Sequence, residues 1–447
     1  MEKKPTLKAV RGTRDLLPDE TPLWNHVEHT ARALFARYGF GEIRTPIFES
    51  TELFARGVGE ETDIVSKEMF TWEDRARAAS EKPQSLTLRP ESTAGVVRAY
   101  IEHKLGETGQ LQKLFYIGPQ FRRERPQRGR YRQFWQIGAE VIGPQTSGAE
   151  SPIRDAEVLE MLASLLDELG IRDWKLELNS VGNTEDRARY NVALREALVP
   201  VAHLLCVDNQ RRAETNPLRV LDSKDEADQD IINALPKIAD YLGEDSRTHF
   251  AEVLKALDAC AVPYNINPRL VRGLDYYTRT TFEFTVTTGL GTQNALLGGG
   301  RYDGLSEMLG GPKAPGIGFA IGEDRLILTL QAQAEEDRTA RVAHSSQSHR
   351  DEWGTTKLDA YIAPIGTAQN AAALTLAREL RRAGLTIEVG DGKFKLGKSF
   401  DTADKLARHV ILLGDDEAAT NILTVKTFAT GEQTKIARDL LAKTLQA

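Results

Sequence analysis

The chain has 447 residues, of which 40% are hydrophobic and 28% are charged. These proportions are ordinary for a folded globular protein, and the length predicts about three domains. The formal net charge of −7 excludes a generally basic nucleic-acid binder, so any contact with RNA must use a local basic surface.

The cysteines and the start of the chain narrow the class of protein further. Only Cys206 and Cys260 occur, without a CxxC or a partnering histidine pattern, so we predict no disulfide framework and no metal site. The first residues, MEKKPTLKAVRGTRD, lack the apolar core of a signal peptide, and no apolar run is long enough to span a membrane. We therefore expect a cytoplasmic protein that does not bind a membrane.

An amphipathic helix is predicted near the N-terminus. Thr21 is the expected cap and Pro22 takes the first helical position. The apolar residues then recur at a spacing of three to four, namely Trp24, Val27, Ala31, Leu34, Phe35 and Tyr38, until Gly39 ends the helix. The spacing predicts one buried face.

A strand over residues 86–89 and a helix beginning near Ser92 are predicted next. Glu91 and Thr93 stand at the start of this helix, where carboxylates and hydroxyls commonly bond to free backbone amides. Helix capping is therefore one interpretation of these two residues.

Two strands, over residues 114–121 and 131–142, are joined by a loop rich in arginine, which predicts a hairpin. Alternation along the second strand places Arg132, Gln136 and Glu140 on one face, and Trp135, Ile137, Ala139 and Val141 on the other. A buried carboxylate beside a buried amide is costly without a partner, so we expect a polar small molecule on this face.

The loop of the hairpin has the composition of an anion site. It carries one acid, Glu124, among the arginines Arg122, Arg123, Arg125, Arg128 and Arg130. Planar guanidinium groups pair with phosphate or carboxylate oxygens through two parallel hydrogen bonds. The alternative is a solvated, charged hairpin tip.

Three later stretches also carry polar or glycine-rich patterns. In NPRLVRGLDYYTRTTFEFTV, strand alternation places Arg272, Leu274, Tyr276 and Thr278 on one side and Tyr277 on the other, although adjacent tyrosines are also typical of core packing. The glycines of ALLGGGRYDGL let a backbone approach a ligand closely. APGIGFAIGEDRLIL predicts a strand, a turn and a helix with Arg325 in its first turn, where a bound anion would offset the helix dipole.

The end of the chain predicts a separate domain. Residues 331–353 are polar and indicate a linker, and the last residues alternate strands and helices, which predicts a small α/β domain with a mostly parallel sheet. The segment Gly392–Ser399, GKFKLGKS, satisfies the P-loop pattern, although Phe394 and Leu396 are bulky for a loop that must curl around phosphate.

FRRERPQRGRYRQFWQIGAE resembles motif 2 of class II aminoacyl-tRNA synthetases, and in detail that of the histidyl-tRNA synthetase family. GFGEIRTPIFESTELF and APGIGFAIGEDRLIL resemble motifs 1 and 3, and RGLDYY and ALLGGGRYDGL resemble the two histidine-specific segments. The resemblance covers essentially the whole chain. It implies an α/β fold whose core is an antiparallel sheet flanked by helices, and a homodimer formed through motif 1.

The resemblance also implies a division of the chain. The class II catalytic core takes residues 1–183 and 262–330, a helical insertion takes 184–261, a linker takes 331–355, and an anticodon-binding domain takes 356–447.

The activity implied is that of a histidine–tRNA ligase, which activates histidine with ATP to histidyl-adenylate and transfers it to the 3′ end of tRNA(His), with Mg²⁺. By resemblance, Arg122 and Arg272 flank the α-phosphate and the carboxylate. The other implied contacts are Arg130 and Arg325 with the outer phosphates; Glu124 with adenine; Glu91, Thr93 and Gln136 with the α-amino group; Glu140, Tyr276 and Tyr277 with the imidazole; and Arg125 and Gln127 with tRNA.

Two departures and two alternatives accompany this interpretation. The family usually has glycine where Ser92 stands, which predicts some crowding there, and many members have a hydrophobic residue at Glu323 and glutamate at Asp324. One alternative is a non-catalytic, synthetase-like, histidine-binding regulatory subunit of ATP phosphoribosyltransferase, although such proteins typically lack the anticodon extension. The other is a P-loop NTPase that uses Gly392–Ser399.

Overall fold

The structure, a computed structural model, describes residues 6–59, 62–74, 83–223, 225–271, 274, 276–291, 294–342 and 357–446. The chain divides into two compact units, Met1–Ser348 and His349–Ala447. No helix in the described ranges combines the length and the apolar character needed to cross a membrane.

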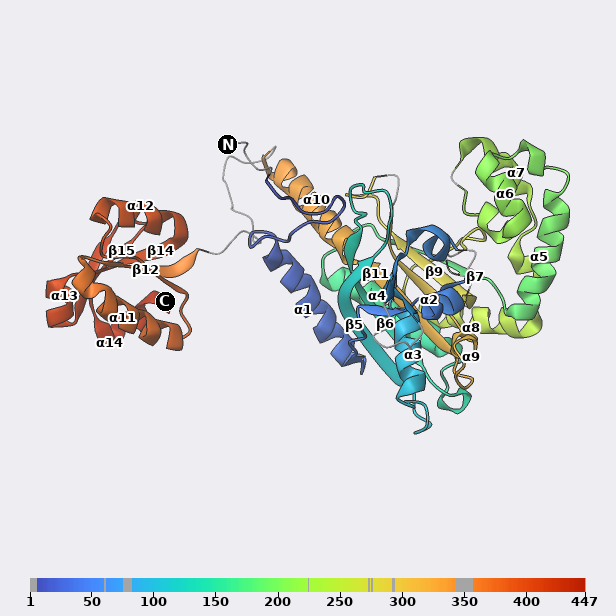
Figure 1. Cartoon of the computed structure of the whole chain (residues 1–447), viewed down its shortest axis with the longest axis horizontal. Coiled ribbons are helices and arrows are strands. Elements are labelled where there is room, and N and C mark those ends of the chain that lie inside the picture. Colours follow the sequence, from blue (N-terminus) through green and yellow to red (C-terminus); the bar gives the residue numbers. More distant parts are fainter. Residues whose placement is uncertain are drawn as a thin grey trace. The chain divides into compact units, whose positions relative to one another are not determined.

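An eight-stranded sheet organises the first unit (Figure 1). Its order is β1 (Gly41–Glu42), β5 (Gln112–Phe121), β6 (Gln133–Ile142), β11 (Gly316–Gly322), β10 (Ala295–Arg301), β9 (Thr278–Thr285), β7 (Lys175–Ser180) and β8 (Asn265–Ile266). Only the outer pairs, β1 with β5 and β7 with β8, are parallel. The predicted antiparallel core flanked by helices is therefore confirmed.

Four helices pack on one face of this sheet: α1 (Thr21–Arg37), α4 (Pro152–Glu168), α8 (Glu244–Ala259) and α10 (Glu323–Val342). On β6, Ile137, Ala139 and Val141 point into this core, as the alternation predicts. On α4, the residues Ile153, Ala156, Leu159, Leu162, Leu166 and Leu169 recur at a spacing that predicts one buried stripe, and this prediction is wrong only at Ile153, which is 52% exposed.

The opposite face of the sheet is only partly covered. It carries α3 (Thr93–Glu102) and α9 (Leu305–Met308), which pack with the end of β6 in a second, smaller apolar cluster. Beside them lie α2 (Thr51–Val58), a π-helical turn (Ile64–Glu68) and a small sheet of β2 (Phe48–Ser50), β4 (Gln84–Leu88) and β3 (Phe70–Asp74). Tyr116 of β5 and Gln136 of β6 face the part that stays open.

The segment after β7 is helical, with α5 (Thr184–Leu198), α6 (Val207–Thr215) and α7 (Gln229–Ala234) grouped together (Figure 1). These helices share an apolar cluster of their own, which runs from Val181 to Leu242. In contrast, α8 packs against α4, and its Val253 and Leu257 belong to the core of the large sheet. Helix α10 runs on to Val342, so residues 331–342, where the polar composition predicted a linker, are helical.

The second unit has a five-stranded sheet in the order β13 (Ile387–Val389), β12 (Leu358–Pro364), β14 (Ala407–Leu413), β15 (Ile422–Thr427), β16 (Gln433–Ala437). Its helices are α11 (Asn370–Arg382), α12 (Leu396–Leu406), α13 (Asp415–Thr420) and α14 (Arg438–Gln446). The predicted α/β domain is confirmed. The sheet is less parallel than predicted, because two of its four strand pairs are antiparallel.

Glu323, the first residue of α10, is fully buried where α10 meets α1. Neither of its carboxyl oxygens has a hydrogen-bond partner among the described residues. Burial and the neighbouring acids Glu28 and Asp324 raise the pKa of Glu323 to about 9. The ionised form is therefore unfavourable in the folded protein.

We expect the substitution Glu323→Leu to stabilise the protein at pH 7 by about 3 kcal/mol. The cost of the buried acid is absent below pH 4.5, its ordinary pKa, and grows as the pH rises toward the folded value of about 9, so the gain should shrink at pH 5. Urea unfolding of the variant and the wild-type protein at both pH values measures this difference in the free energy of unfolding. Glu336→Leu, on the exposed part of α10, is the control. A gain that does not depend on pH would contradict the interpretation.

Candidate active site

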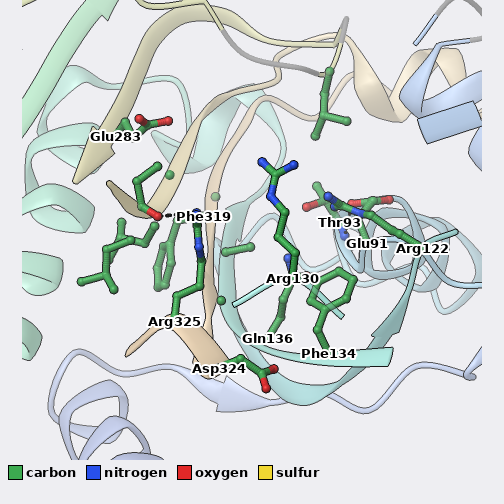
Figure 2. Close-up of a pocket in the computed structure, with 18 of the residues that line it drawn as sticks. Glu91, Thr93, Arg122, Arg130, Phe134, Gln136, Glu283, Phe319, Asp324 and Arg325 are labelled. Carbon is green, nitrogen blue, oxygen red and sulfur yellow. Dashed lines mark hydrogen bonds between the residues drawn. The ribbon is translucent and has the colours of Figure 1, made fainter. Parts of the chain in front are cut away.

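A cleft of about 300 Å³ opens on the partly covered face of the large sheet. It lies over β5, β6, β10 and β11, and the arginine-rich loop and the first turns of α3 and α10 form its walls. Nine of the predicted site residues line it: Glu91, Thr93, Arg122, Glu124, Arg130, Gln136, Tyr276, Tyr277 and Arg325. Figure 2 shows Arg325 and Glu283 on one side of the cleft, Glu91, Thr93 and Arg122 on the other, and Arg130 between them.

Glu140 lies directly beneath the floor of the cleft and is fully buried. Thr93 Oγ1 donates to its Oε1 at 2.7 Å, and the Tyr302 hydroxyl donates to its Oε2 at 2.7 Å. Burial raises the pKa of Glu140 to about 8, against the opposing effect of these two hydrogen bonds. The group is therefore mainly a neutral carboxylic acid at pH 7.

A glycine makes room for this carboxyl group. Gly318 on β11 pairs with Glu140 on β6 and lines the cleft. A Cβ atom at Gly318 would lie 1.7 Å from Glu140 Oε2, so no other residue fits there while the carboxyl keeps its place. Tyr116, whose hydroxyl lies 3.5 Å from Glu140 Oε1, closes the third side.

Glu91 caps helix α3. Its carboxylate accepts from the backbone N–H groups of Thr93 at 2.7 Å and Ala94 at 3.0 Å. The capping interpretation is therefore correct, although carboxylate oxygens retain further acceptor capacity toward the cleft. Ser92 does not crowd this corner, because its hydroxyl accepts a hydrogen bond from Gln120 Nε2 at 2.7 Å.

Two arginines of the loop converge on one acid. Arg122 Nε donates to Pro90 O at 2.9 Å, and its guanidinium lies 5.2 Å from the centre of the Phe134 ring. Glu124 stands between Arg122 Nη1 at 3.8 Å and Arg130 Nη1 at 3.2 Å. The loop thus presents guanidinium groups to the cleft in fixed positions.

Arg325 adds a positive charge from the first turn of α10, as the motif 3 pattern predicts. Its guanidinium donates to the carbonyl of Ala295 on β10. Burial, together with the nearby Arg130, lowers the pKa of Arg325. Two arginines held close to each other at a helix N-terminus favour a bound anion.

Gln136 supplies a polar group to the floor of the cleft. It is 8% exposed, and its Oε1 has no hydrogen-bond partner among the described residues. A buried amide oxygen without a partner is costly, so this position favours a ligand that donates a hydrogen bond.

The prediction for the two tyrosines is wrong in one respect. Tyr276 and Tyr277 both line the cleft and are buried, because the chain enters β9 only at Thr278 and strand alternation does not apply before it. Arg272 lies outside the described residues. Arg125 and Gln127 are exposed at the tip of the loop and do not line the cleft.

Several lining residues escaped the sequence analysis, among them Tyr116, Phe134 and Tyr302. The alternation that selected Gln136 also places Phe134 on the cleft face of β6, so that signal was available. Tyr116 pairs with Gly138, and Tyr302 follows β10. Both reach Glu140 through strand pairing, which no local pattern reveals.

The P-loop interpretation of Gly392–Ser399 is not supported. The N–H of Gly392 donates to Asn370 Oδ1 at 2.9 Å, and the N–H of Lys393 donates to Asp391 Oδ1 at 3.0 Å. Lys398 lies over the Phe394 ring at 4.1 Å. A phosphate-binding loop needs its amides free, and here side chains already occupy two of them.

One group of metal-ligand types occurs in the described ranges, formed by Cys206, Asp225 and Asp228. Asp228 accepts from Cys206 N at 2.9 Å and from Asn209 Nδ2 at 2.6 Å. These bonds give the carboxylate a structural role at the start of α6, so we assign no metal there.

Comparison with known proteins agrees with this geometry. The family model for histidyl-tRNA synthetase matches residues 12–326, and that for the anticodon binding domain matches residues 359–447. The chain is 63% identical to the histidine–tRNA ligase of Koribacter versatilis over 437 residues, covering 98% of this chain and 95% of the relative. It is 52% identical to that of Solibacter usitatus, covering 99% of both.

A solved structure gives the same result. The apo histidyl-tRNA synthetase of S. aureus superimposes with a TM-score of 0.78 at 37% sequence identity, covering 99% of this chain and 100% of that chain. The cleft, the matched sequence families and this structure lead to one conclusion: the chain belongs to the histidyl-tRNA synthetase family.

Proposed function

We propose that the cleft activates histidine with ATP and transfers the histidyl group to tRNA(His). The observation that carries the proposal is the convergence of Arg122, Arg130 and Arg325 above a floor that contains Gln136, with the buried Glu140 directly beneath it. Cations suit the phosphates of a nucleotide, and a buried carboxyl beside an amide suits a small polar amino acid.

Histidine takes the inner part of the cleft. Its α-amino group bonds to Glu91, Thr93 and Gln136, which lie together on the cleft wall and floor. Glu140 and Tyr277 bond to the imidazole nitrogens, and Tyr276 closes the pocket. A site that bonds both nitrogens rejects isosteres, because its buried polar groups would be left without partners.

ATP takes the outer part. Arg130 and Arg325 hold the outer phosphates, Glu124 meets the adenine amino group, and Arg122 and Arg272 flank the α-phosphate. The histidine carboxylate attacks the α-phosphorus, the bond to the β-phosphate breaks, and pyrophosphate leaves. The terminal ribose hydroxyl of tRNA then attacks the histidyl carbonyl and releases AMP. Alignment and charge neutralisation suffice for the first step without a protein nucleophile.

The cleft also suits Mg²⁺. Glu124 and Glu283 both line it, and Mg²⁺ in proteins is typically held by one or two carboxylates together with substrate phosphates. When bound, the ion would neutralise charge on the phosphates. Because Glu124 meets the adenine, Glu283, on the same side of the cleft as Arg325, is the residue that would hold the ion.

Transfer RNA contacts the chain at several places. Arg125 and Gln127, exposed at the loop tip, reach its 3′ end. The part of the insertion that has its own apolar cluster, α5 to α7, lies near the acceptor stem, and residues 356–447 bind the anticodon. The catalytic core comprises residues 1–183 and 262–342 together with α8, and the linker is shortened to residues 343–355, because α10 continues to Val342. Because charged tRNA serves translation, we place the protein in the cytoplasm.

The protein works as a homodimer. Motif 1 and the nearby strand β3 leave three large apolar side chains exposed close together, namely Ile47, Phe48 and Trp72, at 45%, 53% and 40%. The Phe48 and Trp72 rings lie 6.1 Å apart, on the strands β2 and β3 that flank β4. Covering such a patch with a second copy removes it from water.

The regulatory-subunit alternative is not favoured. The chain retains RGLDYY and a matched anticodon-binding domain, and its relatives at 63% and 52% identity are ligases. A solved structure from Bacillus halodurans titled ATP phosphoribosyltransferase regulatory subunit/histidyl-tRNA synthetase shares the fold at 20% identity.

Amino-acid-dependent exchange of pyrophosphate into ATP tests the proposal. With all twenty amino acids supplied one at a time, only histidine should support exchange, because only it satisfies both ends of the inner pocket. Lys398→Ala, in the rejected P-loop, is the matched control and should exchange at the wild-type rate. Histidine binding without exchange would favour the regulatory subunit, and histidine-independent ATP hydrolysis lost in Lys398→Ala would favour the NTPase.

A further inference from the structure

The N-terminal segment, residues 10–14, is seated on the base of the arginine-rich loop. The carbonyl of Gly12 accepts from Arg132 N at 2.7 Å. A Cβ atom at Gly12 would lie 2.8 Å from Pro126 Cγ and 2.9 Å from Arg132 Cγ, and its φ of +90° lies in the region that favours glycine. The segment therefore fits tightly against the loop, at Arg132 on its base and at Pro126 near its tip.

Arg14 extends this contact toward the cleft. Its Nη2 lies 3.2 Å from Asp324 Oδ1, and its Nη1 lies 2.8 Å from Glu20 Oε1. The guanidinium also lies 5.1 Å from the centre of the Tyr131 ring and 5.6 Å from that of Trp24. One planar cation thus holds an acid at the start of α10 and an aromatic ring of the loop at the same time.

Asp324 connects Arg14 to the rest of the site. It is 4% exposed, stands directly before Arg325, and its second oxygen accepts from Trp135 N on β6 at 3.0 Å. Tyr131 stands directly after Arg130 and lines the cleft. Arg14 therefore contacts the immediate neighbours of both arginines that face the outer part of the cleft.

These two arginines repel each other. Arg130 lowers the pKa of Arg325, and a Cβ atom at Gly129 would lie 3.7 Å from Arg325 Cγ, so the loop passes close to α10. Glu124 and Glu283 offset part of this repulsion, and what remains favours moving the loop away from the helix when no further anion lies between the two arginines. A contact that holds the loop to the helix opposes this movement.

We propose that Arg14 is a positioning residue, which through Asp324 and Tyr131 holds Arg130 and Arg325 at the spacing that the outer phosphates of ATP require. This inference rests on the proposed function, because it takes both arginines as phosphate ligands. Arg14 itself does not line the cleft. Its effect should therefore fall on ATP and not on histidine, whose contacts lie on the other wall.

Arg14→Ala tests the inference in histidine-dependent pyrophosphate exchange. We expect the KM for ATP to rise about tenfold and the KM for histidine to stay within about twofold. Arg14→Lys keeps a positive charge for one carboxylate but loses the planar guanidinium and its contact with the Tyr131 ring. Its KM for ATP should therefore lie between that of the wild-type protein and that of Arg14→Ala. Arg11→Ala, at an exposed arginine of the same segment, is the control and should leave both constants unchanged.

An unchanged KM for ATP in a folded Arg14→Ala variant would overturn the inference, and so would an equal rise in both KM values, which indicates general damage. Thermal melting separates these cases from misfolding, and Arg14→Lys carries the test if the alanine variant does not fold. Absence of exchange in the wild-type protein would instead refute the proposed function.

Discussion

Replacing Arg122 by alanine is expected to lower the rate of histidine-dependent pyrophosphate exchange by about 1,000-fold, the scale seen when a group that stabilises transition-state charge is removed. Negative charge on the α-phosphate must be met while the histidine carboxylate approaches it. The bond from Arg122 Nε to Pro90 O and the packing on Phe134 hold the guanidinium in place before substrate binds. The rate constant should therefore fall more than substrate binding weakens.

Arg123→Ala is the matched control, because the next arginine in the loop lies over the Phe70 ring at 6.0 Å and does not line the cleft. Its exchange rate should stay within about threefold of wild type. Arg122→Lys should recover little activity, since an ammonium cannot make two parallel bonds. An equal loss of exchange rate in Arg122→Ala and Arg123→Ala would mean that the total charge of the loop matters and not the position of Arg122. That result would contradict the role assigned to Arg122 at the α-phosphate.

The local elements of the site could be predicted because their causes are local. Alternation along residues 133–142 identified which side of β6 faces the cleft, and the turn before α10 placed Arg325 in the first helical turn. These inferences need only the periods of strand and helix. The resemblance to a known family supplied the other site residues, and nine of the predicted residues meet at one cleft.

The interior of the site could not be predicted in the same way. Glu140 faces Leu114 on the other strand of its own hairpin and Gly318 on β11, and the second pairing joins strands that are far apart in the sequence. Tyr302 reaches Glu140 from beyond a fourth strand. No local pattern states which residues will share a carboxyl group, so the raised pKa of Glu140 was also unforeseen.

Glu91 and Asp324 show a second limit. Both stand at the start of a helix, where a carboxylate favours the free amides, and both also line the cleft. A helix-start pattern predicts the capping role of such a residue whether or not the residue also binds a ligand. Only the tertiary contacts distinguish Glu91 from Asp324, because both oxygens of Asp324 already bond to Arg14 and Trp135.

Replacing Glu140 by glutamine is expected to raise the KM for histidine by about 100-fold and that for ATP by less than about threefold. The carboxyl group can ionise to accept an imidazole N–H while Thr93 and Tyr302 still donate to it. An amide has one acceptor oxygen, and its NH₂ group opposes a donor. Pyrophosphate exchange measures both KM values, and an equal rise in the KM for histidine and the KM for ATP would contradict the role of Glu140.

The same variant should be more stable than wild type at high pH. Folding raises the pKa of Glu140 from 4.5 to about 8, so the ionised form lowers the stability of the folded protein. This cost is absent below pH 4.5, grows with pH between 4.5 and about 8, and is constant above about pH 8. Glu140→Gln removes a cost of about 3 kcal/mol at pH 7, and its melting temperature should exceed the wild-type value there but not at pH 4.5. Glu388→Gln, at an exposed strand position, should show no such dependence. A variant that binds histidine poorly yet melts higher separates the functional role of the carboxyl from a structural one, because a residue retained for stability alone would lose both together.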